Sequence, residues 1–206
     1  MTWREHGIAR GAAGALFMMA CFGIGWSIML VANWTNPFTI VAAVVLIGCA
    51  VFFYLMGVLT MRRLRTWRQT HADDPAPADV IAFGRRAARG FGILFGSEFG
   101  LIGVAVAACL VAGHWEYIIP LCVLIMGAHF FPFARLFRRR FDYFPGTLAM
   151  LIGIGGIVAA ATANDPVVVV ALMGLGGACC TTMYGMYDIW LIRKVMSTTG
   201  PQETAA

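Results

Sequence analysis

Residues 11–61 read GAAGALFMMACFGIGWSIMLVANWTNPFTIVAAVVLIGCAVFFYLMGVLTM and contain no charged side chain. A helix needs about 20 apolar residues to cross the hydrocarbon core of a bilayer, so this stretch is long enough for two crossings. A polar turn at 33–37 divides it into spans at 11–32 and 38–61. Because backbone groups inside a bilayer must bond to one another, each crossing is expected to be helical.

The rest of the chain adds four further apolar runs, at 90–112, 117–137, 144–163 and 166–192, and one long polar loop at 62–89. Only 12% of all residues are charged, whereas soluble domains average about 25%. The sequence therefore predicts an all-α integral membrane bundle of six transmembrane helices. These helices use most of the 206 residues, so residues 1–206 are expected to form a single domain.

All 15 basic residues fall on one side of this six-span pattern. They are Arg4, Arg10, Arg62, Arg63, Arg65, Arg68, Arg85, Arg86, Arg89, Arg135, Arg138, Arg139, Arg140, Arg193 and Lys194. The turns at 33–37, 113–116 and 164–165 contain none. Because basic loops stay in the cytoplasm during insertion, both termini are predicted to be cytoplasmic. Short outer turns and arginine-rich inner loops favour a bacterial inner (cytoplasmic) membrane.

The net charge of +5 is assigned to contacts with the anionic headgroups of the lipid bilayer, not to nucleic-acid binding. Paired spans, each pair ending in basic residues, also indicate an arrangement as three helical hairpins. An internal repeat and the general likeness of membrane hairpins both explain this pattern, and the choice stays open. Gly92, Gly96 and Gly100 recur on one face of the third span, which predicts close helix packing there and a central place for that helix. An oligomer is compatible with the same pattern.

Two ionisable residues interrupt neighbouring spans at matching depth. Glu98 lies nine residues after Arg89, and His129 lies nine residues before Arg138. At about 1.5 Å per residue, both are about 13 Å from the basic boundary, so we expect them to form a pair. A charge at this depth is costly without a partner, and intramembrane ionisable residues usually have functional roles. The alternative is that the pair only ties two helices together.

Polar residues of the sixth span form a stripe beside this pair. Thr181, Tyr184 and Asp188 follow a spacing of i, i+3 and i+7, and Tyr184 is nine residues from Arg193. Pro132 removes a backbone hydrogen bond from the fourth span and is expected to bend it. We predict a cytoplasm-facing polar pocket between the third, fourth and sixth spans. Asp188, near the basic boundary, is alternatively a salt-bridge partner of a nearby arginine.

The segment 129–137, HFFPFARLF, followed by Gly146, resembles a pattern found in uncharacterised bacterial polytopic membrane proteins. The likeness covers the fourth span and the start of the fifth. It implies a multi-pass, six-span membrane protein. It brings with it no known activity, substrate or catalytic residue.

Three function classes follow from these residues. The first is a proton-coupled transporter or permease for a small solute, in which Glu98 carries the proton, His129 is its partner and Pro132 is the point of bending. The second is a non-catalytic membrane scaffold or accessory subunit. The third is a membrane-embedded enzyme acting on a lipid or small amphiphile, with Glu98, His129 and Asp188 as acid–base groups or metal ligands. We rank them in this order, and we expect no cofactor or metal, because the spacing matches no recognised ligand motif.

Overall fold

The computed structural model describes residues 1–33, 36–162 and 166–197. Within these ranges the chain forms six long helices and two short 3₁₀ turns, η1 (Trp115–Tyr117) and η2 (Arg140–Asp142), and no strand. The helices are α1 (Trp3–Asn33), α2 (Pro37–Thr70), α3 (Ala78–Ala112), α4 (Ile118–Phe137), α5 (Tyr143–Thr162) and α6 (Pro166–Ser197). All six are long and apolar enough to cross a membrane. The all-α prediction is confirmed, and the protein is a multi-pass membrane protein. The predicted turn at 164–165 lies outside the described residues.

The polar segment between the second and third spans is largely helical. We expected a cytoplasmic loop over 62–89 with a helix end at 62–68 and a turn at 73–79; α2 continues to Thr70 and α3 begins at Ala78. Arginine is a good helix former, and its long side chain reaches water from a helix that projects beyond the bilayer. The helix stops only near the prolines of the 75–77 segment, which cannot continue it. Both helices are thus longer than the span alone requires.

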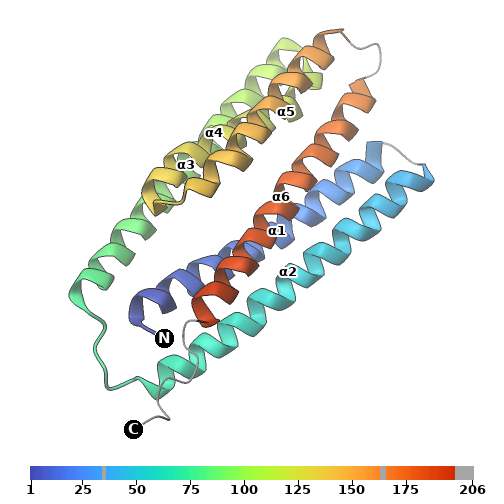
Figure 1. Cartoon of the computed structure of the whole chain (residues 1–206). Helices are drawn as coiled ribbons and strands as arrows, with labels where there is room; N and C mark the ends of the chain where they lie inside the picture. The colour runs from blue at the N-terminus through green and yellow to red at the C-terminus, as the bar shows by residue number, and fades with distance from the viewer. Residues whose placement is uncertain (34–35, 163–165, 198–206) are drawn as a thin grey trace.

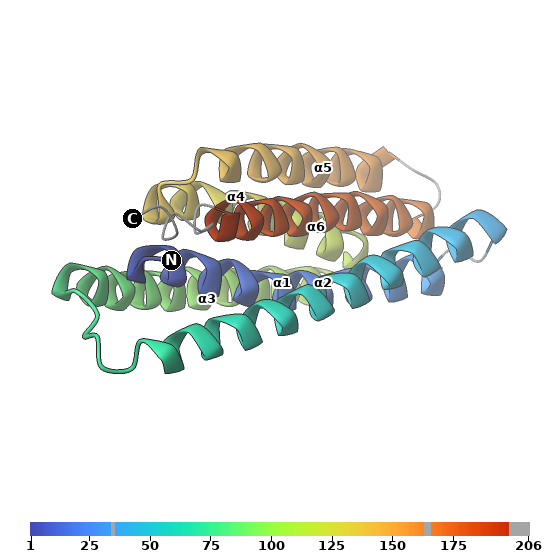
Figure 2. The same cartoon turned by 60° about the horizontal axis from the view of Figure 1, so that its bottom comes forward.

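The helices form two groups that run side by side (Figure 1). In the first group, α1 packs against both α2 and α6; in the second, α4 packs against both α3 and α5. Contacts between α5 and α6 join the groups. The start of α1, the end of α6 and the link from α2 to α3 lie at the same end of the bundle, and Figure 2 shows this end from a second direction. This arrangement places the basic segments together.

The helices of each predicted hairpin, α1 with α2, α3 with α4 and α5 with α6, are in contact. Two of the three most extensive interfaces, α1 with α6 and α4 with α5, nevertheless join different hairpins; the third is α1 with α2. The helices therefore do not behave as three separate hairpins. An origin of the three hairpins from one repeated unit stays a prediction.

The predicted role of the glycines on the third helix is wrong within this chain. A side chain added at Gly92, Gly96 or Gly100 would meet nothing within 4 Å. The described buried residues of α3 are only Glu98 and Cys109, so α3 lies at the edge of the bundle and not at its centre. Glu98 is about 200° from Gly96 around the helix. Because α3 packs on one face only, its carboxylate face is covered and its glycine face is left open.

Close backbone approach occurs instead between α4 and α5. An added Cβ at Gly127 would lie 2.6 Å from the backbone nitrogen of Met150, and one at Gly153 would lie 2.7 Å from that of Leu124. Absent side chains allow two helices to meet backbone to backbone. This contact fixes α4 and α5 relative to each other and therefore holds the short connection between them in one place.

Candidate functional site

Glu98 of α3 and His129 of α4 meet inside the bundle, as the spacing predicted. The distance from His129 Nδ1 to Glu98 Oε1 is 3.2 Å. The Glu98 side chain is 4% exposed and that of His129 is 13% exposed. Among the described residues, neither His129 Nδ1 nor Glu98 Oε2 has a hydrogen-bond partner with good geometry. The contact is therefore electrostatic, and the second carboxylate oxygen is left without a donor.

Three phenylalanines surround the imidazole of His129. Phe130 stacks on it with ring centroids 4.6 Å apart, while Phe133 and Phe95 meet it edge-on at 5.0 and 5.8 Å. An apolar shell strengthens the attraction between opposite charges and makes a lone charge expensive. A charge on either group would therefore be stabilised chiefly by an opposite charge on the other.

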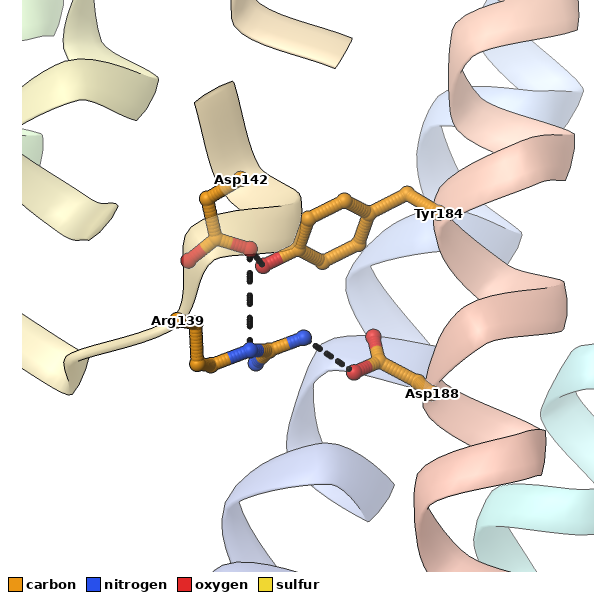
Figure 3. Close-up of polar contacts among 4 residues, drawn as sticks. All are labelled: Arg139, Asp142, Tyr184 and Asp188. Carbon is orange, nitrogen blue, oxygen red and sulfur yellow. Dashed lines mark hydrogen bonds and ion pairs between the residues drawn. The ribbon is translucent and has the colours of Figure 1, made fainter. Parts of the chain in front are cut away.

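A second polar cluster lies where α4, α5 and α6 meet, and it contains Arg139, Asp142, Tyr184 and Asp188 (Figure 3). Arg139 Nη2 donates a hydrogen bond of 3.0 Å to Asp188 Oδ1. Arg139 Nε is 3.5 Å from Asp142 Oδ1, and the Tyr184 hydroxyl donates to the same oxygen at 3.2 Å. Both carboxylates are fully buried, with 0% exposure. One guanidinium thus lies between two carboxylates.

The turn between α4 and α5 directs Arg139 into the protein. Arg138 ends α4 in the left-handed region, with a φ of 53°, and Arg139 is extended. The chain then forms η2 and enters α5. Arg138 and Arg140 remain exposed, whereas the side chain of Arg139 is 20% exposed and its guanidinium lies over the ring of Tyr187, 4.9 Å from the centroid. The local backbone reversal therefore separates one arginine from its two neighbours.

Arg139 remains charged in this setting. Burial alone would lower the pKa of the guanidinium, but Tyr184, Asp188 and Asp142 together raise it above its ordinary value. Among the described residues, Arg139 Nε and the second oxygens of Asp142 and Asp188 have no hydrogen-bond partner. When both carboxylates are ionised, the cluster has one negative charge in excess. A proton is the smallest species that neutralises such an excess.

The two clusters are neighbours connected by aromatic rings. Phe130, which stacks on His129, is also 5.3 Å from the ring of Tyr184. The described buried carboxylates of the region are Glu98, Asp142 and Asp188, and the basic side chains facing them are Arg139 and His129.

The three residues predicted as one polar stripe on the sixth helix have different partners in the structure. Tyr184 and Asp188 belong to the Arg139 cluster, and the alternative that Asp188 pairs with a nearby arginine is confirmed. Thr181 does not join them: its hydroxyl accepts a hydrogen bond of 3.1 Å from the indole of Trp26 on α1. It turns toward α1 because that helix covers this part of α6. Pro132 lies within α4, which continues to Phe137, and the bend expected there stays a prediction.

Sequence reasoning missed Arg139 and Asp142. Arg139 was counted with the basic residues that set orientation, and Asp142 falls in the short connection between two predicted spans. One signal was available. Asp188 lies inside an apolar helix and requires a cation, and Asp142 is the acid closest to the basic connection.

The described residues contain no group of three His, Cys, Asp or Glu side chains placed to hold a metal ion. Asp188, suggested above as a ligand beside Glu98 and His129, is bonded to Arg139 instead. Comparison of the chain with protein-family models, curated proteins and solved structures gave no match.

Proposed function

We propose that this protein is a proton-coupled transporter of a small solute in the inner membrane, with both termini in the cytoplasm. The observation that carries the proposal is the set of three buried carboxylates, Glu98, Asp142 and Asp188, faced by one arginine and one histidine. Buried charge in a membrane bundle is costly, and it is retained where protons or substrates are handled. The basic segments favour a cytoplasmic position for this site.

Glu98 is the proton carrier in this proposal. With Glu98 ionised and His129 protonated, the two attract each other across 3.2 Å in an apolar shell. Addition of a proton to the Glu98 carboxylate leaves the protonated imidazole without its counter-ion, and loss of the imidazole proton leaves the carboxylate alone, so the charge attraction is lost in either case. A proton taken up or released by this pair therefore changes how firmly α3 is held to α4.

The position of α3 makes this change consequential. The helix lies at the edge of the bundle, and its main neighbour is α4. Glu98 is one of only two buried residues described for it. Since few other contacts oppose movement, a change in the Glu98–His129 attraction is expected to shift the equilibrium between two positions of α3. A transporter requires two such positions, each of which opens the substrate site to one side of the membrane.

The accessory-subunit reading is supported by a different observation. The open face of α3 with Gly92, Gly96 and Gly100 offers a smooth surface to another transmembrane helix. This second function would place α3 against a partner protein. It would then make no use of proton exchange at Glu98.

The test compares two Glu/His pairs of the same chain. Purified protein is screened by thermal shift against a panel of small solutes, and solutes that stabilise it are tested in proteoliposomes containing a pH-sensitive dye. Glu98→Gln removes the carrier carboxylate. Glu116→Gln is the matched control, because Glu116 pairs with His114 at 3.0 Å in an exposed turn.

We expect solute-dependent proton movement in wild type and in Glu116→Gln, and none in Glu98→Gln that retains its helical content. Equal proton movement in wild type and in Glu98→Gln would contradict the proposal. Association of Glu98→Gln with an unchanged partner protein, together with no solute response in wild type, would favour the accessory-subunit function.

A further inference from the structure

A groove lies between α2 and α6 at the basic end of the bundle, and none of the clustered carboxylates lines it. Its volume is about 500 Å³, which is within the usual range of about 300–1,000 Å³ for ligand sites. Met56, Leu59 and Ile192 form its apolar part, and Thr60, Arg63 and Arg193 form its polar part. We propose that this groove binds one anionic phospholipid by its phosphate headgroup and the upper part of its acyl chains.

The polarity of the groove changes along the helices in the same direction as that of a lipid. On α2, Met56 lies seven residues before Arg63, which is about 10 Å along the helix axis. The apolar end points into the predicted span, and the arginine end lies at the basic boundary where headgroups are located. A soluble anion would use only the arginine end. A phospholipid uses both ends.

The two arginines have no acidic partner in the described part of the chain. No ion pair or hydrogen bond of Arg63 or Arg193 is found there. Helix α2 contains no acidic residue, and Asp188, the one acid of α6, is bonded to Arg139. Two unpaired guanidinium groups from different helices therefore converge on one groove. Arginine binds phosphate oxygens through paired N–H groups, which gives both charge and geometric complementarity.

Thr60 adds a polar group to the wall of the groove. Its side chain is 3% exposed, it lines the groove, and no hydrogen bond of its hydroxyl is found among the described residues. Its place between the apolar end and Arg63 matches the level at which the ester oxygens of a phospholipid lie below the phosphate. The groove thus presents a donor at each polar level of the lipid.

The test uses a charge-matched pair of double variants. Arg63→Gln with Arg193→Gln removes both groove arginines, whereas Arg62→Gln with Lys194→Gln removes two neighbouring charges that do not line the groove. Each protein is titrated with phosphatidylglycerol in detergent and the bound lipid is counted by native mass spectrometry. Phosphatidylcholine with the same acyl chains and glycerol phosphate without chains are the comparison ligands.

We expect wild type to hold one phosphatidylglycerol molecule and the groove variant to bind it about thirtyfold more weakly, at about 1 kcal/mol for each lost arginine. The neighbouring-charge variant should retain nearly all of the affinity. Ser197→Trp, which fills the groove without removing a charge, should also lose the lipid. Equal weakening in both double variants, or equal binding of phosphatidylcholine or of glycerol phosphate, would overturn the proposal.

Discussion

Arg139→Gln would leave Asp142 and Asp188 without the guanidinium that lies between them. Removing one partner of a buried ion pair typically costs about 3–5 kcal/mol, because the other charge stays buried. The Arg139 side chain is 20% exposed, so water partly compensates the loss. We therefore expect the lower end of this range, about 3 kcal/mol of unfolding free energy. Asp188→Asn, which removes a carboxylate and keeps the guanidinium, should reduce the unfolding free energy by less.

Asp188→Asn would remove the hydrogen bond of 3.0 Å to Arg139 but would also remove the excess negative charge of the cluster. A lost hydrogen bond to a charged group costs about 1.5–3 kcal/mol, and relief of the repulsion from Asp142 offsets part of it. We expect a net cost of about 1 kcal/mol. The ordering follows from charge: one guanidinium serves two carboxylates, so losing the guanidinium costs more than losing one carboxylate.

The measurement is chemical denaturation of purified protein in mild detergent, followed by loss of helical circular dichroism. Arg138→Gln is the control, since Arg138 is adjacent in sequence but exposed. It should change stability by less than about 0.5 kcal/mol. The reasoning would be refuted if Asp188→Asn destabilised the protein as much as Arg139→Gln. It would also be refuted if Arg139→Gln behaved like the exposed control.

Three further outcomes are expected. Glu98→Gln should abolish a pH-dependent carboxyl band in difference infrared spectra of the reconstituted protein, and persistence of the full band would remove Glu98 as a proton carrier. Gly127→Ala should destabilise the protein by about 2 kcal/mol through overpacking, whereas Gly100→Ala should be neutral or stabilising, as thermal unfolding would reveal. Trp26→Phe should lower the unfolding free energy by about 1 kcal/mol, because it removes the indole hydrogen bond to Thr181. If Trp26→Phe destabilised the protein more than Thr181→Val does, lost packing of the indole and not the hydrogen bond would be the cause.

The depth of a residue in a membrane helix could be predicted from sequence because two regularities combine. The basic boundary marks one membrane surface, and a helix advances about 1.5 Å per residue from it. Glu98 and His129 are equally far from that boundary on two helices joined by a short turn. These conditions predicted that the two side chains meet, and the structure places them 3.2 Å apart. Six apolar spans were predictable because each is a run of apolar residues long enough to cross a bilayer.

The Arg139 cluster could not be predicted in this way. Whether a boundary arginine faces headgroups or the protein interior depends on the backbone at one position, here the left-handed conformation of Arg138. It also depends on the close approach of α4 and α5 at Gly127, which fixes where the turn lies. The spacing of residues along the chain encodes neither the backbone conformation of Arg138 nor the close approach of α4 to α5. The glycine face of α3 illustrates the same difficulty, because small residues permit close packing without requiring it.

The two clusters differ in what they hold together, and this difference bears on mechanism. Arg139 and Asp142 lie in the connection of α4 with α5, and Asp188 ties them to α6, which packs on α1. The Glu98–His129 contact instead ties the peripheral α3 to α4. Under the proposed function, a proton at Glu98 would alter the attachment of α3, while Arg139 keeps the other helices in register. Proton-dependent movement should therefore be concentrated in α3 and be small in α6. Movement of α6 with α3 fixed would assign the proton instead to the Asp142 and Asp188 cluster.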